Sequence, residues 1–114
     1  MIRVASQGER GAYSEAAAID SYRLSLRQQY RAAEAYRGIG WSAHYLGDYV
    51  VAFAAFESAL QADPKLADAC NGLGWVALRQ GECTEAAAFF NKALALQSDL
   101  DDAQRGLQQC ALAP

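Results

Sequence analysis

Small and apolar residues recur between positions 33 and 66 at the three- and four-residue spacing of amphipathic helices. Gly47 interrupts the pattern once, and Asp63-Pro64 ends it, because proline disfavours helical geometry in the preceding residue and cannot continue the hydrogen-bond ladder. Small residues such as Gly40 and Ala52 alternate with large side chains such as Phe56. This alternation is typical of helices that approach each other closely. The pattern predicts a helix, a turn and a second helix.

The next 34 residues repeat this pattern without a gap. Residues 33–66 and 67–100 share 13 of 34 positions, where unrelated chains of this composition would share about three. The first members of these pairs are Ala33, Ala35, Gly38, Gly40, Trp41, Ala43, Gly47, Ala52, Ala54, Phe56, Ala59, Leu60 and Leu66. The chain therefore contains at least two copies of one helical unit.

Two glycines one period apart are predicted to form the turn inside each helix pair. Gly47 and Gly81 can adopt the left-handed conformation that ends a helix. Asp48 and Thr84 follow them, and we expect both to help start the next helix. Ser98-Asp99 stands in the second unit where Asp63-Pro64 ends the first.

The two units resemble the tetratricopeptide repeat (TPR), a 34-residue helix-turn-helix with the pattern W-x2-L-G-x2-Y, A-x3-F and P. The matching residues are Ile39, Gly40, Ala52, Phe56, Ala59 and Pro64, then Leu73, Gly74, Ala86, Phe90 and Ala93. Tyr36 and Cys70 replace the signature tryptophan, Ala43 and Ala77 the tyrosine, and Ser98 the second proline. The resemblance implies an all-α fold, in which antiparallel helix pairs form a right-handed superhelical stack, a TPR-like α-solenoid.

The flanks extend the array into a single domain over residues 1–114. Two full repeats, 33–66 and 67–100, lie between a flanking helix at each end. Residues 13–32 are expected to form the lone helix of a degenerate repeat, because Ala18, Tyr22 and Leu26 precede Ala52, Phe56 and Leu60 by one period. Residues 1–12 form an N-terminal extension, and residues 101–114 a capping helix with a polar outer face. One apolar flank of the lone helix is then uncovered.

The first helix of each unit is predicted to present two faces. Its packing stripe in the first unit would contain Tyr36, Ile39, Gly40, Ala43 and Leu46. The resemblance implies that first helices line a concave groove, where partners lie as extended peptides or helices. The candidate groove residues on the opposite face are Arg37, Trp41, His44, Tyr45, Asn71, Trp75, Leu78, Arg79 and Arg105.

Trp41 and Trp75 allow two interpretations. Tryptophans flanked by Arg, Asn, Tyr and His have the composition of an interface hot spot, in which they would anchor a partner. Alternatively, the two rings pack between adjacent first helices, which repetition in each unit would also produce. The sequence leaves both open.

Composition and charge exclude several classes of function. Hydrophobic residues make up 53% and the net charge is −3, so the chain can bury a core and lacks the clustered basic residues of a nucleic-acid surface. The printed sequence shows neither a signal peptide nor a run of 18 apolar residues, which predicts a cytoplasmic protein without a membrane role. His44 is the sole histidine and the three cysteines lack metal-ligand spacing, so we expect no metal, no cofactor and no enzyme activity.

The predicted function is a protein–protein interaction scaffold that binds a peptide or helix of unknown identity in its groove. The alternative is a homo-oligomerisation or assembly module that uses the groove and the uncovered N-terminal helix. Self-association could pair two sets of charges: the basic stripe of Arg23, Arg27 and Arg31, and the acidic Asp99, Asp101 and Asp102 of another copy. A solvated basic face is the simpler explanation of that stripe.

Overall fold

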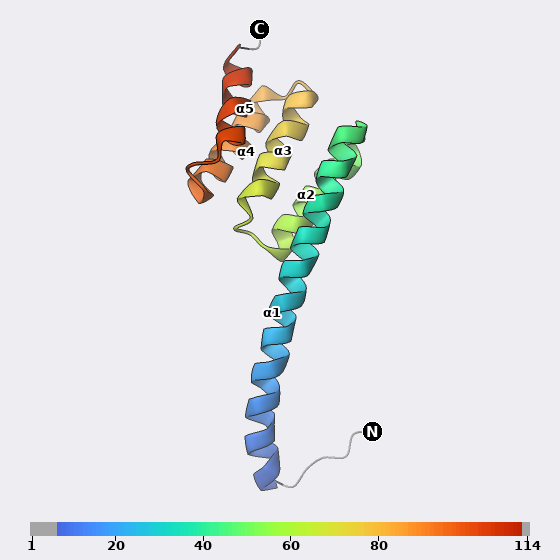
Figure 1. Cartoon of the computed structure of the whole chain (residues 1–114), viewed down its shortest axis with the longest axis vertical. Helices are drawn as coiled ribbons and strands as arrows, with labels where there is room; N and C mark the ends of the chain where they lie inside the picture. Colours follow the sequence, from blue (N-terminus) through green and yellow to red (C-terminus); the bar gives the residue numbers. More distant parts are fainter. Residues whose placement is uncertain (1–6, 113–114) are drawn as a thin grey trace.

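The computed structural model describes residues 7–112, which form five α-helices and contain no strand. The helices are α1 (Gln7–Leu46), α2 (Tyr49–Ala62), α3 (Ala67–Arg79), α4 (Cys83–Leu96) and α5 (Asp101–Leu112). Helices α2 to α5 stack as antiparallel neighbours beside the C-terminal part of α1, and the N-terminal part of α1 extends beyond the bundle (Figure 1). The molecule therefore measures 71 × 28 × 17 Å. The predicted all-helical stack is confirmed.

Helix α1 runs without a break through the predicted boundary between a lone helix (13–32) and the first repeat. The places of Asp63 and Pro64 are taken one period earlier by Gln29 and Tyr30, which are compatible with a helix. The two predicted elements are therefore one helix, which also includes residues 7–12 of the expected extension. Residues 1–6 and 113–114, and the side chains of Ala18 and Tyr22, lie outside the described part of the structure.

The turns within the helix pairs form as predicted. Gly47 and Gly81 have φ values of 83° and 80°. After each glycine, the next residue donates its backbone N–H to a carbonyl five residues earlier: Asp48 to Ala43 and Glu82 to Ala77, both at 2.9 Å. Asp48 caps α2 by accepting a hydrogen bond from the backbone N–H of Val51. Thr84 does not cap α4, because Glu82 occupies that position and Thr84 lies inside the helix.

Each contact between units centres on a buried phenylalanine placed between two glycines. Phe56 of α2 packs against Gly40 and Gly72, where an added Cβ would meet its ring; at Gly40 the separation would be 2.7 Å. Phe90 of α4 lies in the same way between two glycines of α3 and α5. Small residues in the first helices therefore let each second helix approach closely enough for its ring to fill the gap.

The predicted packing stripe is only partly correct in the first unit. Gly40 and Ala43 are buried, whereas Ile39 is 49% and Leu46 84% exposed, and Tyr36 is also exposed. One period later, α2 covers the equivalents of Tyr36 and Ile39, which are buried. The stripe fails in α1 because no helix among the described residues precedes it in the stack.

Candidate partner-binding site

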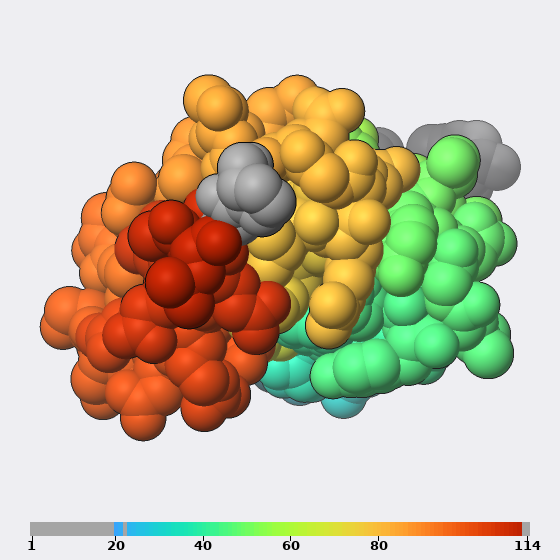
Figure 2. Space-filling view, turned by 90° about the horizontal axis from the view of Figure 1, so that it is seen from above, coloured from blue at the N-terminus to red at the C-terminus, as the bar shows by residue number. Residues whose placement is uncertain are grey.

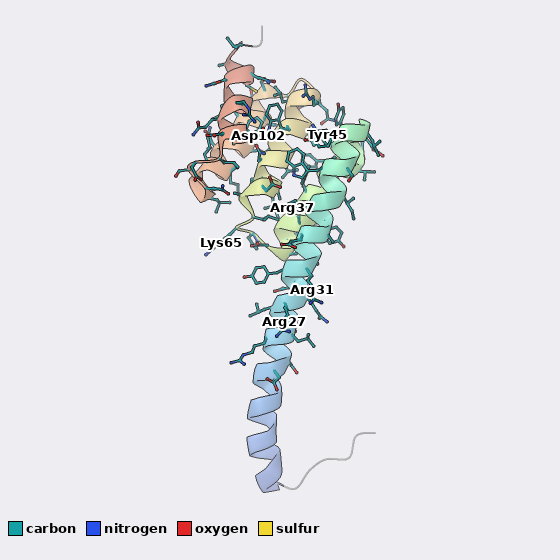
Figure 3. All side chains as sticks on the ribbon, viewed as in Figure 1. Arg27, Arg31, Arg37, Tyr45, Lys65 and Asp102 are labelled. Atoms are coloured by element: carbon teal, nitrogen blue, oxygen red, sulfur yellow. The ribbon has the colours of Figure 1, made fainter. Side chains whose placement is uncertain are left out.

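The first helices α1, α3 and α5 contribute jointly to one face of the molecule. Seen from above in Figure 2, the end of α1, then α3 and then α5 follow one another across the stack. A hollow of about 130 Å³ lies on these three helices. Figure 3 shows two of its residues, Tyr45 and Asp102, on either side of α3. The lining residues are Trp41, His44, Tyr45, Trp75, Arg79 and Asp102.

Asp68 links α1 to α3 at this face. Its carboxylate accepts a hydrogen bond from the indole N–H of Trp41 at 2.8 Å, and the Arg37 guanidinium lies 3.8 Å from the same oxygen. The Trp41 ring also contacts Phe56 edge-on, with ring centroids 5.1 Å apart. Trp41 is therefore held by the protein on two sides.

Asp102 of α5 repeats this arrangement one period later. It accepts hydrogen bonds from the Asn71 amide at 2.8 Å and from the Arg105 guanidinium at 2.9 Å. Partial burial alone would raise the pKa of Asp102, but these two hydrogen bonds, the charge of Arg105 and the nearby indole N–H of Trp75 together lower it below its ordinary value. The Asp102 carboxylate therefore stays ionised and adds negative charge beside the hollow.

Aromatic rings surround the hollow on the α1 side. Trp41 stacks on Tyr45 with centroids 6.0 Å apart, and His44 meets both rings edge-on. On α3, the Arg79 guanidinium lies 5.7 Å above the centre of the Trp75 ring. The site therefore places several aromatic rings next to the Arg79 guanidinium.

Two buried polar atoms at this face, His44 Nδ1 and Asn71 Oδ1, have no hydrogen-bond partner among the described residues, and the buried Trp75 indole N–H faces Asp102. Burial, and then the charge of Arg79, lower the pKa of His44, although Asp102 partly opposes this change. The imidazole is therefore neutral at pH 7. Buried polar groups are normally paired, so the two unpartnered atoms are suited to hydrogen bonds with a ligand.

The structure brings five of the nine predicted residues into the hollow: Trp41, His44, Tyr45, Trp75 and Arg79. Asn71 and Arg105 adjoin it through Asp102, and Arg37 adjoins it through Asp68, which also binds Trp41. Leu78 instead packs against the second core cluster.

The exposure of each side chain distinguishes residues that can contact a partner from residues that pack inside the protein. Tyr45 is 80% exposed and Arg79 is also exposed, but Trp75 is only 8% exposed and packs edge-on against Phe90. Burial therefore favours the packing interpretation for Trp75.

The sequence prediction missed Asp68 and Asp102 as site residues. They stand one period apart, and each follows a repeated tryptophan by 27 residues. That spacing was the available signal.

Two larger hollows lie elsewhere. One, of about 380 Å³, is formed by α2, α3 and the start of α4; the other, of about 570 Å³, lies on the outer face of α1 and α2. Neither is lined by His44, Asn71 or Trp75. We therefore regard the smaller hollow as the candidate site.

Comparison with protein families agrees with this architecture. Family models described as tetratricopeptide repeat match residues 43–113 and residues 16–67. The chain belongs to the tetratricopeptide repeat family. Tetratricopeptide repeats generally mediate protein–protein interaction and are typically non-enzymatic scaffolds. A search of the curated proteins found no match to this TPR chain.

The described residues of this TPR fold lack two further kinds of feature. None of the helices combines the length and the apolar character required to cross a membrane. The described side chains also contain no group of three or more His, Cys, Asp or Glu residues that could hold a metal ion.

Proposed function

We propose that this TPR domain binds a segment of a protein partner across the hollow formed by α1, α3 and α5. The observation that carries the proposal is the combination of exposed Tyr45 and Arg79 with buried polar atoms of His44 and Asn71 that lack partners among the described residues. Aromatic and arginine side chains dominate the energetics of many interfaces. The hollow is formed by packed helices, which reduces the ordering cost of binding.

The chemistry of the site indicates what the segment contains. Asn71 Oδ1, which has no partner among the described residues, can accept a hydrogen bond from a peptide N–H. An apolar or aromatic side chain would pack on Tyr45. Arg79 would pair with an acidic side chain of the segment, because a guanidinium can donate two parallel hydrogen bonds to a carboxylate. We therefore propose a mixed apolar and acidic partner segment.

Replacing Tyr45 and Arg79 by alanine should weaken such binding without unfolding the domain, since both side chains are exposed. Peptides selected from a displayed library against the intact chain would serve as probes, with affinity measured by calorimetry. We expect the double variant to lose at least about tenfold in affinity. The two tryptophans are poorer targets, because Trp41 and Trp75 pack in the core clusters.

Tyr30→Ala is the matched control, because Tyr30 is an exposed aromatic residue on the projecting part of α1. Its affinity for the selected peptides should equal that of the unmodified chain. Equal affinity of the double variant and the control would contradict the proposed site, and so would peptide-induced NMR shifts confined to the outer face of α1 and α2.

A second candidate function is assembly with another copy of this chain. The outer hollow on α1 and α2 is lined by Ile39, Leu46 and Val51, all of them exposed. Gly38, in the same hollow, has open space where the equivalent Gly72 is covered by Phe56. A second copy can pair through the same face, because a two-fold interface is self-complementary. Pairing through the acidic cap is less favoured, because Asn71 and Arg105 already engage Asp102.

Sedimentation equilibrium tests this second function. The unmodified chain is expected to form dimers that persist at high salt, because the contact is apolar. Ile39→Glu should convert the dimer to monomer, since it would bury a charge in the contact. Tyr30→Glu adds the same charge away from this face and should leave the dimer intact. A monomeric unmodified chain at high protein concentration would rule the assembly out.

A further inference from the structure

Cys83 and Cys110 lie together at the contact between α4 and the cap helix α5. The Cys110 thiol donates a hydrogen bond to the backbone carbonyl of Cys83, with sulfur and oxygen 3.6 Å apart. Both side chains are partly exposed, whereas the remaining cysteine, Cys70, is fully buried. An oxidant can therefore reach the first two thiols more readily than the third.

The repeat explains why these two positions meet. One period earlier they correspond to Tyr49 and Val76, which belong to the same packed cluster in the first unit. The second unit and the cap have cysteine at both equivalent positions. Two positions that belong to one packed cluster in the first unit are thus both occupied by thiols one period later.

We propose that Cys83 and Cys110 form an intramolecular disulfide under oxidising conditions, and that this bond fixes the cap helix α5 to α4. Helix α5 is the last described helix and contacts only α3 and α4. The two cysteines are separated by 27 residues, so the bond would close most of the second unit into one loop. The bond does not depend on the proposed partner binding.

Oxidised glutathione is a sufficient oxidant. The Cys83 thiolate attacks one glutathione sulfur, forms a mixed disulfide and releases the first glutathione. The Cys110 thiol then loses its proton and attacks the Cys83 sulfur, which releases the second glutathione. In total the protein gives up two protons and two electrons, and one oxidised glutathione becomes two reduced molecules.

The two thiols differ in the step that each can perform. Cys83 is the first residue of α4 and is partly exposed, so glutathione can reach its sulfur for the first step. Burial and the neighbouring Cys83 thiol raise the pKa of Cys110 to about 11. Cys110 is therefore protonated at neutral pH, and the second step should limit the rate. Below this pKa we expect closure to accelerate by roughly tenfold per unit of rising pH.

The test is incubation of the intact chain with oxidised glutathione, followed by mass spectrometry of the protein and its peptides. We expect a mass loss of two hydrogens, a peptide pair linking Cys83 to Cys110, and no change in oligomeric state. Hydrogen exchange of the α5 amides should slow by about tenfold or more on oxidation, because the bond suppresses local opening of the cap.

Three variants separate this bond from other reactions of the thiols. Cys83→Ser and Cys110→Ser should each abolish both the mass loss and the slower exchange, whereas Cys70→Ala should retain both. A disulfide that links two copies through Cys110 would overturn the proposal, as would persistent reduced thiols or a Cys83–Cys110 bond that leaves α5 exchange unchanged.

Discussion

Replacing Phe56 by alanine should lower the free energy of unfolding by about 3–5 kcal/mol. The Phe56 side chain is fully buried and fills the space between glycines of α1 and α3. Its removal deletes apolar contacts with both first helices at once. On these helices the ring packs against two glycines, which have no side chains that could fill the cavity. Urea denaturation followed by circular dichroism measures the change.

Val50→Ala provides the control for this experiment. Val50 lies on the same helix, α2, but is 77% exposed. Its replacement should change the free energy of unfolding by less than about 0.5 kcal/mol. A loss below about 1 kcal/mol in Phe56→Ala would show that the contact between the two units does not depend on this ring.

The same substitution, glycine to alanine, should have opposite effects at two positions one period apart. Gly72→Ala should destabilise the protein by about 1–3 kcal/mol, because its Cβ would overlap the Phe56 ring. Gly38→Ala should stabilise it by about 0.5–1 kcal/mol, because a Cβ there meets nothing within 4 Å and alanine favours the helix. Urea denaturation, at a protein concentration where the chain is monomeric, measures the free energy of unfolding of both variants.

A double-mutant cycle identifies the cause of the Gly72 effect. Phe56→Leu should cost less in the Gly72→Ala background than in the unmodified chain, since the smaller side chain relieves the overlap. Additive losses would indicate that the new Cβ acts through some contact other than the Phe56 ring. Equal signs at Gly38 and Gly72 would contradict the proposed difference between covered and open positions.

Much of the fold could be predicted because each local feature occurs in both repeat units. Gly47 and Gly81 both mark a turn, and Phe56 and Phe90 both mark a buried ring. The boundary after residue 32 could not be derived from the period alone. A period shows where a unit would begin, but it does not show whether the helix ends there. Pro64 prevents α2 from continuing, whereas α1 has Tyr30 at the equivalent place and continues.

The site was predicted less completely, for a different physical reason. Periodicity places Trp41 and Trp75 on one side of their helices, but it does not show how far the neighbouring first helix covers them. The position of each ring depends on a carboxylate of the next unit. The prediction concentrated on aromatic and basic residues, so it left these carboxylates out. Asp68 receives the Trp41 indole N–H, so the ring belongs partly to the scaffold. Tyr45, without such a partner, is the exposed member of the group.

Within the described residues, each helix contacts only its next and next-but-one neighbours. The hydrogen bonds that join first helices span 27 or 31 residues, less than one unit. Every partner in these contacts is therefore supplied by the same or the adjoining unit. Such a molecule can be lengthened by copying residues 67–100 in tandem, because each duplicate would bring its own ring, its own glycines and its own carboxylate into register.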